Sequence, residues 1–212
     1  MTLPIITNDP RSDVKVIAIE GCNGTGKTTL LNAYTKLHTD VECKLCVPKI
    51  YQTAKDTKHY MLYESTALCS ALYYLGGAVE VKATHNKNYS KIVFDRSVWS
   101  TFAAAYSKDE SILSELFGCL KAIRNYVFIP DHIVVLDATY ETCKQRIMLK
   151  QEGAEFDKDS YNQFEKKRHF YKMLKEVGYP MSFIDVNNLT EKGVLLEFEE
   201  IANKVFNFIG VR

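Results

Sequence analysis

Two glycines, a lysine and a threonine near the N-terminus have the spacing of a loop that binds phosphate. The segment GCNGTGKT starts at Gly21 and fits the pattern G-x4-G-K-[ST]. Glycines let the backbone wrap an anion with its N–H groups pointing inward, and a following helix presents its positive end to the same anion. Lys27 would reach the β- and γ-phosphates, and the Thr28 hydroxyl would ligate Mg²⁺. The predicted ATP·Mg²⁺ site consists of Gly21, Cys22, Asn23, Gly24, Thr25, Gly26, Lys27, Thr28 and Thr29.

Two apolar segments each end in an aspartate that could hold the metal. KIVFD ends at Asp95 and HIVVLD ends at Asp137, and either carboxylate could bind Mg²⁺ through water. Arg96 and Ser97 follow Asp95 directly. In phosphoryl transfer a carboxylate holds metal or orients the acceptor, and a guanidinium offsets charge on the moving phosphoryl group or clamps an acceptor phosphate. Asp95 and Arg96 are therefore predicted to be catalytic together with Lys27, whereas Asp137 is also placed to start a helix.

The bulk composition indicates one globular domain. The chain has 212 residues, of which 46% are hydrophobic and 25% charged, and its formal net charge is +1. This near-neutral charge argues against a nucleic-acid partner without excluding a local basic groove. No apolar run reaches the roughly 20 residues that cross a bilayer, and the N-terminus shows no leader pattern. We expect a cytoplasmic protein whose six cysteines are free thiols, because the lone CxxC at Cys43 and Cys46 is a weak zinc signal.

The order of apolar and amphipathic segments predicts an α/β sheet. Short apolar runs predict strands at residues 14–19, 43–47, 91–95, 132–137 and 181–186. Amphipathic segments predict helices at 27–37, 57–75, 98–106, 109–125, 139–149, 160–177 and 190–209, the second of them ended by Gly76 and Gly77. Strands that are apolar throughout are typical of a parallel sheet with helices on both faces. Such sheets bind ligands at the carboxyl ends of their strands.

Four segments together resemble the thymidylate kinase and deoxynucleoside kinase superfamily of P-loop kinases. They are IEGCNGTGKTTL, FDRSVWS, PDHIVVLDATYETCKQRI and FIDVNN, in the order of that superfamily. The resemblance implies a three-layer α/β fold with a five-stranded parallel sheet in the order 2-3-1-4-5. It also implies a kinase domain at residues 14–212, after a lead-in at 1–13, with a lid at about 150–158. ATP is the implied phosphoryl donor.

The same resemblance assigns further donor contacts. Arg146 would pack near the adenine, Lys150 would reach the phosphates, and Asn187 would border the adenine. Lys150 stands where an arginine is usual, and Glu152 stands where a second lid arginine is usual. The lid therefore lacks part of the cationic clamp. The cations in the run EKKRHFYKML at 165–174 form a solvated face in one interpretation. In the other, a cation such as Lys158 or Arg168 folds over the phosphates.

The acceptor is predicted from Lys49 and from the helix at residues 57–75. Deoxynucleoside kinases have a glutamate at the position of Lys49 that accepts the proton of the attacking hydroxyl, which a lysine charged at pH 7 cannot do. Thymidylate kinases use an arginine there to hold the acceptor phosphate, so Lys49 favours a monophosphate. Ala67 lies near the place of a second nucleotide-binding arginine, which leaves thymine specificity unsupported. Tyr63 is a candidate for stacking on the base, and the apolar helix is suited either to burial or to homodimer formation.

We predict an ATP-dependent deoxynucleoside monophosphate kinase. One alternative is a deoxynucleoside 5′-kinase that acts on a free hydroxyl. A second alternative is a kinase that acts on a modified base or an end in DNA, and a third is a nucleotide-binding module without an enzymatic acceptor. Product identification after incubation with labelled ATP separates the four.

Overall fold

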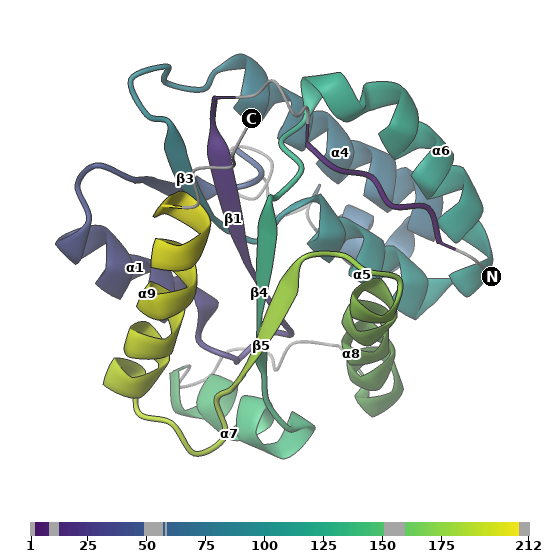
Figure 1. Ribbon diagram of the computed structural model, residues 1–212. Coiled ribbons are helices and arrows are strands. Elements are labelled where there is room, and N and C mark those ends of the chain that lie inside the picture. The colour runs from purple at the N-terminus through teal and green to yellow at the C-terminus, as the bar shows by residue number, and fades with distance from the viewer. Residues whose placement is uncertain (1–2, 9–12, 49–56, 58, 151–159, 208–212) are drawn as a thin grey trace.

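The computed structural model describes residues 3–8, 13–48, 57, 59–150 and 160–207 of the chain. A five-stranded parallel sheet lies at its centre, in the order β2-β3-β1-β4-β5 (Figure 1). The strands are β1 (Lys15–Glu20), β2 (Glu42–Leu45), β3 (Lys91–Asp95), β4 (His132–Asp137) and β5 (Met181–Asp185). The predicted fold class and strand order are confirmed.

Helices cover both faces of this sheet. They are α1 (Lys27–Leu37), α4 (Ala67–Ala83), α5 (Val98–Lys108), α6 (Leu113–Ile123), α7 (Tyr140–Lys150), α8 (Tyr161–Glu176) and α9 (Glu191–Asn207). Three shorter helices are the π-helix η1 (Tyr60–Glu64) and the 3-10 helices η2 (Glu110–Ile112) and η3 (Arg124–Tyr126). In Figure 1, α1 and α9 lie on one face, and α4, α5, α6 and α8 on the other. Within the described ranges, no helix is both long enough and apolar enough to span a membrane.

The central strands β1, β3 and β4 are mostly apolar because their side chains alternate between two cores. Ile17 and Ile19 of β1 pack with α1 and α9, whereas Val16 of the same strand packs with the helices on the opposite face. The second core is rich in aromatic rings, including the fully buried Trp99 and Phe102. Burial on both sides fixes the central strands in register, and the parallel pairing brings all five carboxyl ends to one edge.

The predicted helix at 57–75 is wrong in its boundaries. Residues 60–64 form a π-helix, and Ser65 interrupts the helical conformation. Helix α4 begins after Thr66, whose hydroxyl accepts a hydrogen bond from the Cys69 N–H at 3.2 Å. Helix α4 then continues through Gly76 and Gly77 to residue 83. Each interior glycine costs about 1 kcal/mol relative to alanine, and burial of the α4 face that includes Leu75 offsets that cost.

The described part of the lead-in packs on the domain. Leu3 and Ile6 are buried. The Ile6 N–H donates to the Tyr179 hydroxyl at 2.9 Å, and that hydroxyl donates to the Pro4 carbonyl at 2.7 Å. These contacts anchor residues 3–8 beside the start of β5.

Candidate active site

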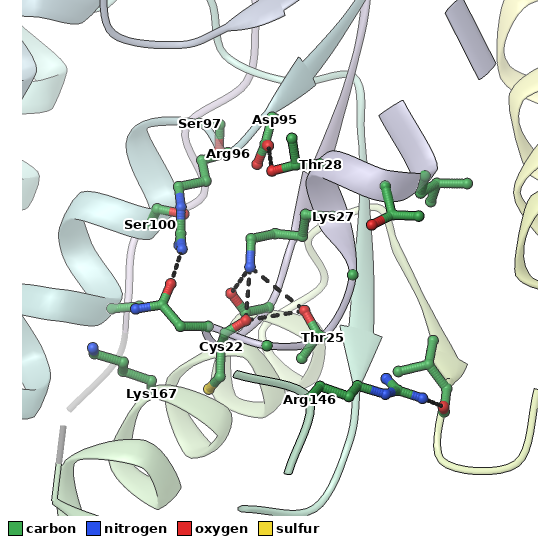
Figure 2. Close-up of a pocket in the computed structure, with 18 of the residues that line it drawn as sticks. Cys22, Thr25, Lys27, Thr28, Asp95, Arg96, Ser97, Ser100, Arg146 and Lys167 are labelled. Carbon is green, nitrogen blue, oxygen red and sulfur yellow. Dashed lines mark hydrogen bonds between the residues drawn. The ribbon is translucent and has the colours of Figure 1, made fainter. Parts of the chain in front are cut away.

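The phosphate loop connects β1 to α1 at the carboxyl edge of the sheet (Figure 2). Gly21 and Gly24 have φ values of 130° and 85°, which favour glycine. A Cβ atom on Gly24 would lie 2.6 Å from the Cys143 carbonyl oxygen, and one on Gly21 would collide with the Leu136 carbonyl oxygen. The loop is therefore pressed between the end of β4 and α7, and only glycine fits at these two positions.

Lys27 folds back onto this loop. Its ammonium group donates to the carbonyl oxygens of Gly21 at 2.9 Å and Cys22 at 2.7 Å. The residue is 5% exposed. Burial, reinforced by the nearby charge of Arg96, lowers the pKa of Lys27 to about 7. Because its charged form is destabilised in the ligand-free protein, an anion bound in the loop would stabilise the Lys27 ammonium strongly.

Thr28 and Asp95 bring a hydroxyl and a carboxylate together. The Thr28 hydroxyl donates to Asp95 Oδ2 at 2.6 Å, and Asp95 is 4% exposed. Among the described residues, no group of three or more histidine, cysteine or acidic side chains could hold a metal. Mg²⁺ commonly uses only one or two carboxylates, with waters and substrate phosphates completing its shell. This oxygen pair therefore fits the ion that the sequence predicts.

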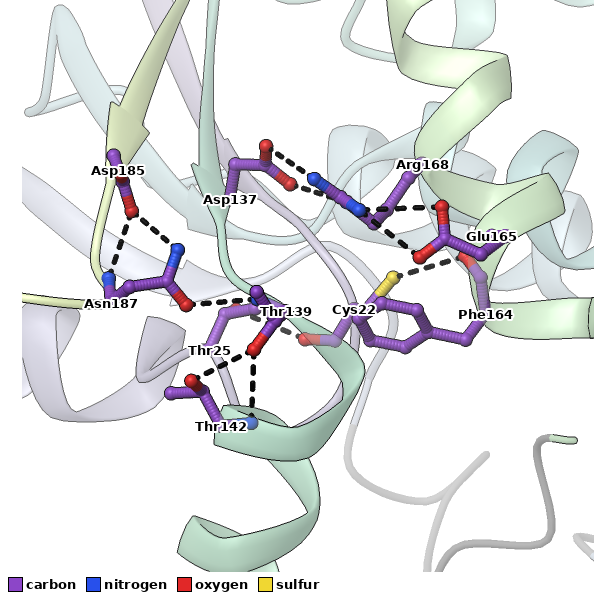
Figure 3. Close-up of polar contacts among 10 residues, drawn as sticks. All are labelled: Cys22, Thr25, Asp137, Thr139, Thr142, Phe164, Glu165, Arg168, Asp185 and Asn187. Atoms are coloured by element: carbon purple, nitrogen blue, oxygen red, sulfur yellow. Dashed lines mark hydrogen bonds and ion pairs between the residues drawn. The ribbon is translucent and has the colours of Figure 1, made fainter. Parts of the chain in front are cut away.

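Asp137, the alternative metal ligand, has a different partner (Figure 3). Arg168 binds both of its carboxylate oxygens, with Nε at 2.7 Å from Oδ1 and Nη2 at 2.9 Å from Oδ2. Arg168 also bonds Glu165 at 3.0 Å. The suggestion that Arg168 folds over the phosphates is therefore corrected: this side chain ties α8 to the end of β4.

Arg96 has a strained backbone. Its φ is 71°, a left-handed conformation that costs a non-glycine residue about 1–2 kcal/mol. Its N–H donates to the Ile19 carbonyl at 2.9 Å, and its guanidinium donates to the Asn23 side-chain oxygen and contacts the Ser100 hydroxyl at 3.5 Å. Such strain concentrates at functional sites. The bend directs the guanidinium across the phosphate loop (Figure 2).

Glu20 holds three residues that line the cavity, and sequence reasoning missed this role. This fully buried carboxylate at the end of β1 accepts hydrogen bonds from Ser97 at 2.5 Å, from Tyr171 at 2.9 Å and from Ser100. Burial raises its pKa, and the three hydroxyl donors partly offset this rise. The same signal that identified Asp95, an acid closing an apolar strand, could have identified Glu20.

A cavity of about 890 Å³ runs along the phosphate loop. Such a volume is ample for a small-molecule site. Arg146, Val186 and Leu189 line one part of its wall, and Tyr74 and Thr101 line another. The loop residues 21–29, Asp95 and Arg96 also line it. Two ligands with their phosphates meeting at the loop are compatible with this shape.

The predicted donor contacts differ in their placement. Arg146 lines the cavity, and its guanidinium donates to the Val186 carbonyl at 2.6 Å. The Asn187 side chain instead accepts from the Thr139 N–H at 2.9 Å and donates to Asp185 at 2.6 Å (Figure 3). Asn187 thus supports the start of α7 and the end of β5 rather than the cavity wall.

Of four other predicted features, the structure locates two, and two lie outside the described residues. Tyr63 lies in η1, and Lys150 is the last residue of α7. Lys49 and residues 151–158 of the predicted lid lie outside the described residues. Tyr74 lines the cavity from α4. It was one of four tyrosines in the predicted helix that could stack on a base, and the sequence did not single it out over Tyr63.

The run of cations at 166–168 divides among three environments. The Lys166 ammonium lies 2.8 Å from Glu110 on the surface. Lys167 lines the cavity, and Arg168 binds Asp137. Successive residues of a helix point about 100° apart, so the three side chains of this run point in different directions and meet different surroundings. The solvated-face interpretation therefore applies to Lys166 alone among these three.

Comparison with known proteins agrees with this architecture. A family model described as "Deoxynucleoside kinase" matches residues 17–210. A thymidylate kinase from Candida albicans is 16% identical, covers 92% of this chain and 93% of its own, and has a TM-score of 0.66. A deoxyadenosine kinase from M. mycoides is 17% identical, covers 90% of this chain and 99% of its own, and also has a TM-score of 0.66. No curated protein sequence matches.

Proposed function

The chain belongs to the deoxynucleoside kinase family of P-loop phosphotransferases, and we propose that it transfers the γ-phosphoryl group of ATP to a deoxynucleoside monophosphate. The observation that supports this acceptor is the charge of the cavity. Four cations line it, Lys27, Arg96, Arg146 and Lys167, against two carboxylates, Asp95 near the phosphate loop and Glu191 at the start of α9. Asp95 is hydrogen-bonded to Thr28. Such a wall suits an acceptor that brings its own negative charge.

A monophosphate acceptor also needs no strong general base. A phosphate ester has a second pKa near 6, so its oxygen is already deprotonated at pH 7 and can attack in line. Catalysis then consists mainly of positioning and charge stabilisation. Lys27, the loop N–H groups and Arg96 offset the charge that spreads over the transferred phosphoryl group. Thr28 and Asp95 would hold Mg²⁺, which neutralises charge on the β- and γ-phosphates when bound.

The two parts of the cavity wall suit two bases. In this proposal the adenine of ATP lies near Arg146, whose guanidinium is already fixed by the Val186 carbonyl. The acceptor base lies near Tyr74 and Thr101, whose ring and hydroxyl offer a stacking surface and a hydrogen-bond partner. The phosphate loop then lies where the two phosphate chains meet.

The second candidate is transfer to the 5′-hydroxyl of a free deoxynucleoside. It is favoured by the description of the matching family and by the likeness to a deoxyadenosine kinase. The likeness to a thymidylate kinase has the same TM-score and favours the monophosphate. A free hydroxyl must lose a proton during transfer. Among the described lining residues Asp95 is the carboxylate placed for that task, and it would have to release Thr28.

Product identification tests the proposal. Labelled ATP and Mg²⁺ are incubated with each deoxynucleoside, each deoxynucleoside monophosphate and a DNA duplex, with Lys27→Ala as the inactive control. Label on one or a few monophosphates is the expected result. Label on a free deoxynucleoside supports the second candidate, and label only on DNA or in inorganic phosphate contradicts both.

A charge reversal at Lys49 sharpens this test. If Lys49 holds the acceptor phosphate, Lys49→Glu should raise the KM for the monophosphate by about 100-fold, because a charge-assisted contact is lost and repulsion is gained. The KM for ATP should stay within about twofold of the wild-type value. Lys36→Glu makes the same charge change at an exposed position of α1 and should alter neither. Equal KM values in all three proteins would remove Lys49 from the acceptor site.

A further inference from the structure

Helix α8 is fixed against the phosphate loop from two sides. Arg168 binds the Asp137 carboxylate at the end of β4. One turn of helix from Lys167, the Tyr171 hydroxyl donates to Glu20 at the end of β1, at 2.9 Å. A helix held at two neighbouring strand ends cannot rotate freely about its axis. The side chain at position 167 therefore has a defined direction.

That direction is toward the cavity. Lys167 is half-buried and lines the cavity together with the phosphate loop, Arg96 and Ser100. Figure 2 shows Lys167 and Arg96 on the same side of the loop. The preceding Lys166 lies 2.8 Å from Glu110 at the surface. The structure thus separates two adjacent lysines, one facing the cavity and one facing away.

Besides Arg146 of α7, which the proposal places near the adenine, the cavity gathers cations from three further elements. Lys27 comes from α1, Arg96 from the turn after β3, and Lys167 from α8. Like charges around one cavity repel one another, and an anion that lies between them relieves this repulsion. The phosphoryl group in transit spreads charge over three equatorial oxygens and offers an oxygen to each cation.

We infer that Lys167 binds the phosphoryl group in transit from ATP to the acceptor. Resting on the proposed phosphoryl transfer, the inference adds to it a catalytic residue on α8. Lys167 stands on α8, after the segment predicted to be the lid, in which Glu152 occupies a position where the resemblance implies an arginine. A lysine suits this place because its compact ammonium can follow an oxygen that moves between two partners.

A substitution pair tests the inference. Lys167→Ala is compared with Lys166→Ala, its matched control on the same helix, and with the conservative variant Lys167→Arg. Turnover with the preferred acceptor should fall by about 100-fold in Lys167→Ala. The KM for the acceptor should change little. Lys167→Arg should recover most of the turnover, and Lys166→Ala should retain all of it.

A binding measurement without acceptor gives a second readout. Calorimetry compares a non-hydrolysable ATP analogue with ADP. Loss of a contact to the terminal phosphoryl group should weaken the analogue by about tenfold in Lys167→Ala and leave ADP unchanged. Fluorescence of the single tryptophan, Trp99, follows thermal unfolding in each variant. Unchanged turnover, or equal losses for the analogue and ADP, would overturn the inference.

The two arms separate this inference from the proposed function. If no monophosphate is labelled but Lys167→Ala still loses its preference for the ATP analogue, the proposed acceptor fails and Lys167 stands. If monophosphates are labelled and the Lys167→Ala protein equals wild type in both arms, the proposed function stands and Lys167 has no part in transfer.

Discussion

Nucleotide binding should be coupled to proton uptake by Lys27. Burial within the phosphate loop, and secondarily the charge of Arg96, lowers the pKa of Lys27 to about 7 in the ligand-free protein. Its ammonium is held by two carbonyl oxygens, from Gly21 and Cys22. A phosphate in the loop would replace these dipoles with a full negative charge. The protonated form then becomes strongly favoured.

The size of the effect follows from Coulomb attraction. Two unit charges 4 Å apart interact by about 4 kcal/mol at an effective dielectric constant near 20, which raises the pKa by about 3 units, to about 10. At pH 8 about 0.9 of the free lysine is neutral, against about 0.1 at pH 6, given a pKa of about 7. Binding should therefore take up about 0.9 proton at pH 8 and about 0.1 at pH 6. Because the complex holds more protons, affinity should fall as pH rises from 7 to 10.

Calorimetry with ADP in buffers of different ionisation enthalpy measures this uptake directly, since the slope of the observed enthalpy against the buffer enthalpy is the number of protons. Lys27→Arg is the control, because arginine stays charged across this range. Its slope at pH 8 should be near zero while binding persists. A zero slope for wild type at pH 8, or the same slope in Lys27→Arg, would refute the reasoning.

Three further substitutions test the fold around the site. Gly24→Ala should weaken ADP binding at least tenfold by calorimetry, because its Cβ would lie 2.6 Å from the Cys143 carbonyl and its φ is 85°; unchanged affinity would contradict the close approach. Gly76→Ala meets no atom within 4 Å and should raise stability by about 0.5–1 kcal/mol, seen as a melting temperature about 1–4 °C higher; a melting temperature below that of the wild type would mean strain in α4. Asp137→Ala should cost roughly 1–2 kcal/mol, because it leaves the partly exposed Arg168 without its bidentate partner; denaturant unfolding measures this, and Lys166→Ala, which breaks only a surface pair, should change little.

The elements that could be predicted were those set by local pattern. The central strands β1, β3 and β4 are short apolar runs buried on both faces, so their positions followed from the sequence to within one residue. The phosphate loop was equally local, because its glycines, Lys27 and Thr28 lie within eight residues. The helix at 57–75 failed for the opposite reason: Gly76 and Gly77 carry a local cost, and burial of α4 against other elements outweighs it.

The site contacts that could not be predicted are long-range. Arg168 and Asp137 are 31 positions apart, and Tyr171 and Glu20 are 151 positions apart. A charged run shows no direction in sequence, so the separate roles of Lys166, Lys167 and Arg168 became visible only once α8 was placed. Asn187 likewise has a side chain that could contact a nucleotide. Its position after β5 instead lets it accept a hydrogen bond from the Thr139 N–H.

The strained Arg96 and the buried Glu20 form one arrangement. Ser97 and Ser100, in the first turn around the start of α5, both donate to the Glu20 carboxylate. This fixes where α5 begins relative to β1, so the chain must turn sharply after Asp95 and Arg96 takes its left-handed conformation. A hydrogen bond contributes about 0.5–1.5 kcal/mol net, so the two serine bonds together are of the same order as a strain of about 1–2 kcal/mol. The guanidinium is thus aimed by a carboxylate it does not touch, and the direction of Arg96 depends on Glu20 as much as on its own sequence position.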